Sequence, residues 1–277
     1  MPPSSARIPA RSERLSAWRA LPTLLRIGFA ESIAYRGEVI LWMLTMTMPL
    51  VSLALWSVVA ADGPVGGYSQ TQFADYFLVI LAVRMGTGTW VTWSISSEVR
   101  EGHLSMRLLR PLHPLASYAV EMLGAIPLRI LCAVPPAAVA LFVVASDGVR
   151  YATPCIALVL ALIGVWCLTF TISAAIGALA LFMGSAIGPF MVWQGLFAIF
   201  SGYLVPTKLF PGWLSTLADW LPFRYALGFA AEAVLGRLAP GELWRGLLLQ
   251  WGYVVVMTIL TLFLFRRGVR RYEAYGS

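Results

Sequence analysis

Apolar residues occur in six long runs along this chain, and polar residues are concentrated in the segments between them. The runs cover residues 38–60, 73–95, 117–145, 154–183, 186–205 and 246–265. An α-helix needs about 20 apolar residues to cross the hydrocarbon core of a bilayer. Because the runs are continuous and do not alternate as the strands of a barrel do, they predict transmembrane helices. The expected fold is an all-α polytopic membrane protein with six transmembrane helices.

The composition agrees with this expectation. Hydrophobic residues make up 59% of the chain, charged residues 12%, and the mean hydropathy is +0.78. The net charge of +7 does not indicate nucleic acid, because most basic residues lie in segments that share one side of the predicted membrane. They are Arg7, Arg11, Arg14, Arg19, Arg26, Arg36, Arg100, Arg107, Arg110, Arg266, Arg267, Arg270 and Arg271. By the positive-inside rule, both termini are expected to be cytoplasmic.

The segments around the runs predict the organisation of the chain. Residues 1–37 are expected to form a cytoplasmic tail and an amphipathic helix in the membrane interface, and residues 266–277 a basic cytoplasmic tail. Between them, residues 38–265 form the transmembrane domain. Within it, residues 96–114 alternate charged and apolar positions and predict a short amphipathic cytoplasmic helix. Residues 206–245, rich in Pro, Gly and aromatic residues, predict short helices that re-enter the membrane from the external side.

The sequence indicates no catalytic, metal or nucleotide site. Lys208 is the only lysine and is followed by Leu209, whereas a phosphate-binding loop requires lysine followed by Ser or Thr. His103 and His113 are the only histidines, and they do not form the HExxH pattern of zinc proteases. The spans contain no recognisable pair of nucleophile and base. We therefore expect neither an enzyme nor a cofactor held by this chain.

Three charged residues fall inside the predicted spans. Arg84 in the second span and Arg129 in the third are expected near mid-bilayer, and Glu121 nearer the cytoplasmic end of the third. A charge at that depth costs at least a few kcal/mol unless it faces a partner or a wet cavity. Two interpretations remain open. The arginines form ion pairs with a neighbouring helix or subunit, or they line a path for an anionic or polar substrate.

Two groups of short motifs add to the six-span layout. The first runs from Glu98 through Gly102-His103-Leu104 to Leu108-Leu109-Arg110-Pro111. The second comprises Leu209-Phe210-Pro211-Gly212-Trp213, Leu221-Pro222-Phe223-Arg224 and Leu235-Gly236. In this order and placement they resemble the membrane subunit of ABC exporters of the type 2 permease superfamily. The resemblance is to the bacterial branch whose six-span permeases are encoded separately from their ATPase, and it covers nearly the whole chain.

The resemblance implies a coupling helix between spans two and three that seats on an ABC ATPase subunit. The ATPase-facing residues would be Glu98, Arg100, Glu101, Leu104, Arg107 and Arg110. It also implies that the segment between spans five and six caps the external mouth, and the residues that carry this segment are Phe210, Pro211, Trp213, Pro222 and Phe223. ATP and Mg²⁺ would bind to the partner ATPase. A second permease, either the same chain or a homologue, would complete the pathway in the bacterial cytoplasmic membrane.

Other interpretations compete with this one. The charges of residues 96–114 could be solvated residues that only orient the chain in the membrane. A secondary transporter or channel working without ATP is disfavoured, because the two halves show no clear repeat and the spans contain very few carboxylates. A membrane scaffold shares the same composition and stays open. For an exporter, the scarcity of charge in the spans favours a lipophilic compound as the substrate.

Overall fold

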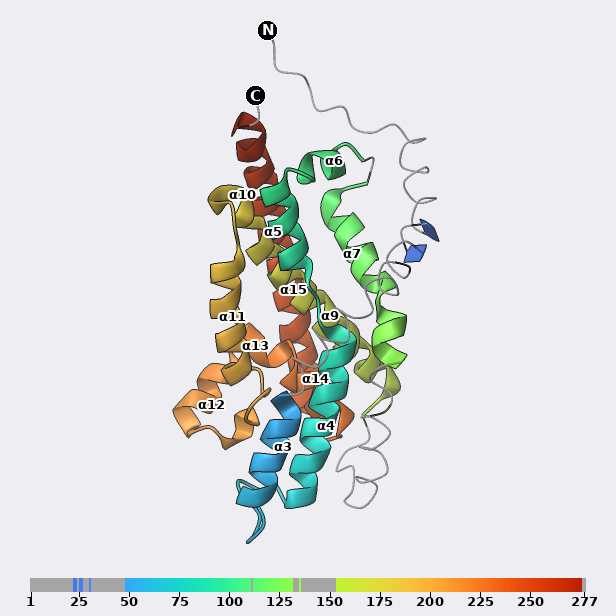
Figure 1. Ribbon diagram of the computed structural model, residues 1–277. Helices are drawn as coiled ribbons and strands as arrows, with labels where there is room; N and C mark the ends of the chain where they lie inside the picture. Colours follow the sequence, from blue (N-terminus) through green and yellow to red (C-terminus); the bar gives the residue numbers. More distant parts are fainter. Residues whose placement is uncertain are drawn as a thin grey trace.

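The computed structural model describes an all-α protein over residues 48–110, 112–131 and 153–275, with isolated positions at 22, 23, 25, 26, 30 and 135 (Figure 1). The interfacial helix predicted within residues 1–37 lies largely outside the described residues. The helices are α3 (Met48–Val59), α4 (Gln70–Thr87), α5 (Val91–Glu101), α6 (Leu104–Leu108), α7 (Pro114–Gly124), α9 (Cys155–Ala178), α10 (Ala180–Met183), α11 (Ile187–Phe200), η1 (Thr207–Leu209), α12 (Gly212–Asp219), α13 (Pro222–Tyr225), α14 (Gly228–Val234) and α15 (Pro240–Tyr275).

The helices form an elongated bundle whose two ends differ. One end carries α6, α10 and the last turns of α15, and we call it the α6 end (Figure 1). The opposite end carries α12 together with the loop that joins α3 to α4, and we call it the α12 end. The four arginines that follow the last predicted span, Arg266 to Arg271, therefore lie at the same end as α6.

Within the part of the chain that the structure describes, four helical segments are long and apolar enough to cross a membrane. They are Gln70–Glu101, Pro114–Leu131, Cys155–Met183 and Pro240–Tyr272. Each overlaps one of the predicted runs, so the continuous apolar stretches correctly located these helices. Most of the described part of the first run and residues 187–200 of the fifth form the shorter apolar helices Met48–Val59 and Ile187–Phe200. Six complete spans stay a prediction.

The fifth run ends earlier than residue 205 because the chain turns at Gly202. The 14 residues of α11 extend about 21 Å at 1.5 Å per residue, short of the roughly 30 Å of a bilayer core. Gly202 has a φ of 85°, which disfavours any residue with a side chain. The Tyr76 hydroxyl donates to the Gly202 carbonyl at 3.0 Å and occupies the space that a Cβ would need. This contact fixes the turn against α4.

The second run, predicted as one helix over 73–95, is interrupted near its middle. Regular helix stops at Thr87 and resumes at Val91, and Gly88 between them has extended backbone with φ −59° and ψ 151°. Gly and Thr are weak helix formers, and they alternate at this point in the sequence Gly86-Thr87-Gly88-Thr89. Arg129 donates a hydrogen bond to the Gly88 carbonyl. The side chain of another helix therefore satisfies backbone that the interruption leaves without a helical partner.

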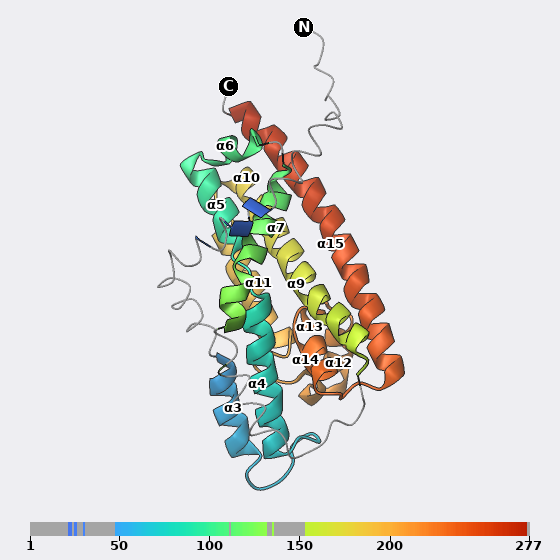
Figure 2. The ribbon, with the colours of Figure 1, turned by 90° about the vertical axis from the view of Figure 1, so that its right-hand side faces the viewer.

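The centre of the bundle is the long pairing of α9 with α15, which lie side by side in both views (Figures 1 and 2). Polar side chains on α15 bond to the backbone of α9. The Gln250 amide donates to the Ala161 carbonyl at 3.1 Å, and the Thr261 hydroxyl donates to the Thr171 carbonyl at 2.8 Å. Such bonds hold helices together in lipid, where the hydrophobic effect provides little force between them. The pairing forms the frame on which α5 and α4 pack.

Candidate functional site at the α6 end

The segment of residues 96–114 forms a tight turn between two of the long helical segments, and we call it the α6 segment. Its first helix, α5, ends at Gly102, which adopts the left-handed conformation with φ 76° that commonly stops a helix. The five residues of α6 follow, and α7 begins at Pro114, a residue favoured in the first turn of a helix. Leu104 is fully buried among residues of α5, α7 and α9 and anchors the turn to the bundle.

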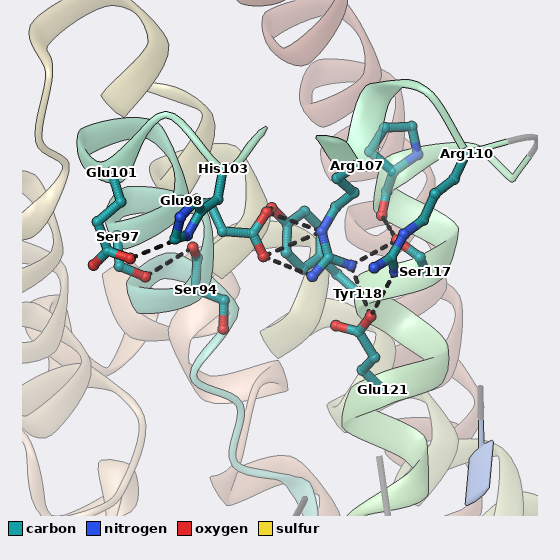
Figure 3. Close-up of polar contacts among 11 residues, drawn as sticks. Ser94, Ser97, Glu98, Glu101, His103, Arg107, Arg110, Ser117, Tyr118 and Glu121 are labelled. Carbon is teal, nitrogen blue, oxygen red and sulfur yellow. Dashed lines mark hydrogen bonds and ion pairs between the residues drawn. The ribbon is translucent and has the colours of Figure 1, made fainter. Parts of the chain in front are cut away.

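Arg107 lies at the centre of a network of hydrogen bonds and ion pairs (Figure 3). Its Nη2 and Nε donate to the two carboxylate oxygens of Glu98 at 2.6 and 2.9 Å. Its Nη1 donates to Glu121 Oε1 at 2.7 Å and to Ser117 Oγ at 2.8 Å. A bidentate pair of this kind fixes geometry as well as charge. The network therefore ties α6 to both α5 and α7.

Tyr118 adds two contacts to the network, one of them with the face of the Arg107 guanidinium group. Its ring lies 3.9 Å from the Arg107 Cζ atom, and its hydroxyl donates to Glu98 Oε2 at 2.6 Å. Burial opposes the charge of Arg107, but the hydrogen bonds that it donates to Glu98 and Glu121 outweigh burial and raise the pKa of Arg107 above its ordinary value. Arg107 therefore carries a permanent charge that its neighbours neutralise.

The outer surface of the α6 segment combines apolar and charged side chains. Met106 is 67% exposed and Leu109 is 81% exposed. Around them Glu101 and His103 form an exposed pair at 3.3 Å, and the half-exposed Arg110 lies 3.8 Å from Glu121. Large apolar residues exposed outside the apolar spans and surrounded by charges are typical of a protein contact surface.

The six residues expected to face an ATPase thus divide into two groups. Arg100, Glu101 and Arg110 are on the surface, and their predicted role stays a prediction. The other three do not face outward, because Leu104 is in the core while Glu98 and Arg107 bind one another beneath the surface. The structure therefore places three of the six beneath the outer surface, and contact of the six residues with an ATPase stays a prediction.

The predicted intramembrane residues also lie in two places. Glu121 pairs with Arg107 at the α6 end. Arg84 lies on α4 with its guanidinium carbon 4.7 Å from the centre of the Phe197 ring, and Arg129 lies 4.2 Å from that of Trp90. Both arginines are buried beside the interruption between α4 and α5. Within the described residues, the ion pair expected for Glu121 is present, and its partner is Arg107.

The residues expected at the external mouth lie at the α12 end. Pro211 and Pro222 stand at the starts of α12 and α13, Phe210 packs on Phe200, and Phe223 stacks on Trp193 at 4.6 Å. Trp213 is 72% exposed. The short helices predicted within 206–245 are therefore present. Their position relative to a membrane stays a prediction.

A separate ion network holds these short helices together. Arg224 forms ion pairs with Asp219 on α12 and Glu232 on α14, the latter at 2.7 Å. Glu232 is fully buried, so its charge depends on this partner. The sequence analysis included Arg224 in a motif but did not anticipate either partner.

Comparison with known families decides the assignment. The protein-family model described as "ABC-2 family transporter protein" matches residues 45–276. The chain belongs to the ABC-2 transporter family. No curated protein matches the chain. An ABC-2 family protein is a transport permease and not a nucleotide-binding domain, and such permeases generally work with ABC ATPase subunits. The resemblance to a type 2 ABC permease that the short motifs indicated is confirmed.

Within the ABC-2 permease, the sequence analysis missed the partners of Arg107. Ser117 and Glu121 are four residues apart on α7 and so lie on one face of the helix, together with the neighbouring Tyr118. This spacing was the available signal. The exposed Met106 and Leu109 had no such signal, because the sequence alone does not show which apolar residues in and directly after a five-residue helix are buried.

His113 connects the α6 segment to α15. It precedes α7, and its Nδ1 accepts a hydrogen bond from the Leu115 backbone N–H at 3.3 Å. Its ring lies 6.0 Å from that of Phe265. Burial and the nearby charge of Arg266 lower the pKa of His113 below its ordinary value. The neutral form that can accept this bond is therefore favoured.

Proposed function

We propose that this ABC-2 permease is one half of an ATP-driven exporter, coupled to separate ATPase subunits through the α6 segment. A second permease, either the same chain or a homologous one, completes the translocation pathway. ATP and Mg²⁺ bind to the ATPase, since the only lysine of this chain is followed by Leu209 and cannot complete a phosphate-binding loop. Family membership supports the permease role and the class of partner.

The observation that carries the proposal is the division of the α6 segment into a contact surface and an internal clamp. Met106 and Leu109 present apolar area to a partner, and Arg110 adds charge at the edge of that area. Directly beneath, Arg107 holds Glu98 of α5 and Glu121 of α7. A force applied at the surface therefore moves the ends of two long helical segments together.

The cycle follows from this linkage. ATP binding closes the two ATPase subunits, and the α6 segments seated on them move with them. The permease halves then exchange between inward-open and outward-open or occluded states. Such an exchange is driven only by ligands whose affinity differs between the states. The role of Arg107 is to keep α5, α6 and α7 in one fixed arrangement during this movement.

The distribution of charge supports a cytoplasmic location for the α6 end. Arg100, Arg107 and Arg110 share this end with the arginines at the end of α15. The positive-inside rule places such an end in the cytoplasm, where the ATPase is. Both termini are then cytoplasmic, the α12 end faces outward, and the chain is a multi-pass protein of the bacterial cytoplasmic membrane.

Purification of the permease from its native membranes, with the products of neighbouring genes, tests the proposal. The complex should hydrolyse ATP. Replacement of Glu101 or Arg110 by alanine should uncouple hydrolysis from transport while the chain still inserts into the membrane. Normal transport in both variants would contradict the proposed contact. A permease that purifies without any nucleotide-binding partner would instead support an ATP-independent carrier or a scaffold.

A sharper test uses the apolar part of the contact surface. Leu109→Ala should weaken binding of the purified ATPase by about tenfold or more, because truncation of a buried interface anchor commonly costs over 1 kcal/mol. Trp213→Ala is the matched control, since Trp213 is also a large exposed apolar residue but lies at the α12 end. Binding is measured by surface plasmon resonance with the permease in nanodiscs. Equal losses in the two variants would contradict the assignment of the surface.

A further inference from the structure

Arg84 is a buried cation within a candidate membrane span. It lies in the last turn of α4 and only 8% of its surface is exposed. Its guanidinium group is positioned over the Phe197 ring of α11, and its Cζ atom lies 6.0 Å from the centre of the Tyr203 ring. Among the described residues, no carboxylate lies within ion-pair distance of it. The rings of Phe197 and Tyr203 are therefore the main partners of the Arg84 side chain among the described residues.

An aromatic partner leaves the hydrogen-bonding capacity of an arginine largely unused. The ring contacts the face of the guanidinium group, whereas the five N–H donors point outward in its plane. The Arg84 Nε is buried and has no hydrogen-bond partner among the described residues. Donors in this planar fork match the two oxygens of a carboxylate or phosphate group. Arg84 is thus suited to bind an anionic group while it stays stacked on Phe197.

Arg129 brings a second cation to the same place. It donates to the Gly88 carbonyl, and the Gly88 N–H in turn donates to the Arg84 carbonyl at 3.0 Å. Arg129 also faces the ring of Trp90, directly before α5. Both arginines therefore contact the backbone of Gly88, Arg129 through its side chain and Arg84 through its carbonyl. The interruption of the second run therefore concentrates positive charge and aromatic surface inside the bundle.

We propose that Arg84 and Arg129, at the interruption between α4 and α5, form a binding site for the anionic group of a lipophilic compound. Arg84 supplies the hydrogen bonds and Arg129 strengthens the positive potential, while Trp90, Phe197 and Tyr203 contact the apolar body. The proposal rests on the exporter function and names its substrate class, a phosphate or carboxylate attached to an apolar chain. Such a group comes from a membrane phospholipid or from the exported compound itself.

Binding of simple amphiphiles to the purified permease tests this site without any ATPase. The probes are radiolabelled dodecyl phosphate and dodecanol, which have the same chain but differ in charge. Dodecyl phosphate should bind wild type more tightly than dodecanol, and Arg84→Met should weaken dodecyl phosphate about tenfold to a hundredfold. Arg267→Met removes an exposed arginine at the α6 end and should leave the affinity unchanged. Equal affinity in wild type and Arg84→Met would overturn the proposal.

A stability measurement separates this binding role from a purely structural ion pair. Removal of one partner from a buried ion pair is strongly destabilising, because it leaves the other charge buried without a partner. Replacement of a buried charge that has no carboxylate partner leaves no such charge behind and removes a desolvation cost, so it should be neutral or stabilising. Without ligand, Arg84→Met should therefore melt at or above the wild-type temperature. A clearly lower melting temperature would overturn the proposal. Arg84→Lys keeps the charge but not the planar fork, and it should also weaken binding of dodecyl phosphate.

The same assay distinguishes the two sources of the anionic group. Competition by dioleoyl phosphatidylglycerol but not by dioleoyl phosphatidylcholine would support a membrane phospholipid as the ligand. Competition by oleate and not by phosphatidylglycerol would support an exported lipophilic acid. Competition by neither would overturn the site. Because these experiments use the permease alone, loss of the ATPase partnership would not affect their outcome.

Discussion

Arg107 and Arg84 are the same residue type in opposite settings within one bundle. Arg107 is 11% exposed in its side chain and binds two carboxylates, a serine hydroxyl and the face of Tyr118. Arg84 is also buried, but its side chain contacts the aromatic rings of Phe197 and Tyr203. The chain neutralises the first charge itself, whereas the Nε of the second is buried without a hydrogen-bond partner among the described residues. The first arrangement suits a mechanical clamp and the second suits a binding site.

The largest effect is expected when the clamp is broken. Arg107→Met leaves Glu98 and Glu121 beneath the surface without their shared cation, which should destabilise the permease by roughly 3–5 kcal/mol. Arg110→Met is the control, because its side chain is 51% exposed and its pair with Glu121 spans 3.8 Å, a surface interaction typically worth less than about 1 kcal/mol. Thermal unfolding in detergent measures both. Similar losses would show that Arg107 is no clamp.

A triple substitution sharpens this result. With Glu98, Arg107 and Glu121 all replaced by methionine, no unpaired charge remains, so much of the lost stability should return. Coupling of ATP hydrolysis to transport should not return, because the bidentate geometry that fixes α6 is still absent. A triple variant that transports normally would show that packing alone transmits the movement.

The difference between the two arginines was not visible in the sequence. The length of the apolar runs located the long helices, because a bilayer dictates how many apolar residues a span needs. Hydropathy does not report backbone hydrogen bonds, so the interruption at Gly88 was missed although Gly86 and Gly88 were a signal. Glu121 was grouped with Arg84 and Arg129, because depth along a span was known but direction around the helix was not.

The short motifs were more informative about family than about structure. They correctly indicated a type 2 permease. They did not show that Glu98 and Arg107 bind each other across nine sequence positions, because this depends on the tight turn at Gly102 and on where α7 packs. A pattern of charges in sequence thus identified the α6 segment, and only the structure separated its surface from its interior.

A smaller effect is expected from the aromatic partner of Arg84. Phe197→Leu keeps an apolar residue on α11 but removes the cation–π contact, which is worth about 2 kcal/mol when desolvated. Phe190→Leu is the matched control, since Phe190 is also buried on α11 but contacts Trp93 instead of an arginine. Phe197→Leu should therefore lower thermal stability more than Phe190→Leu. An equal loss in both would mean that the ring contributes only packing.

The smallest effect on stability is expected from His113, whose ring lies 6.0 Å from that of Phe265 on α15. Its pKa is lowered in the folded state by burial and by Arg266, so the unfolded chain binds this proton more readily. The stabilising contribution of the neutral ring is complete above its ordinary pKa near 6.5 and declines as the pH falls below that value. His113→Asn keeps a side chain that caps helices but does not titrate. Melting temperatures at pH 8 and pH 5.5 should therefore differ more in wild type than in His113→Asn. Equal differences would show that protonation of His113 is not linked to the packing of α7 against α15.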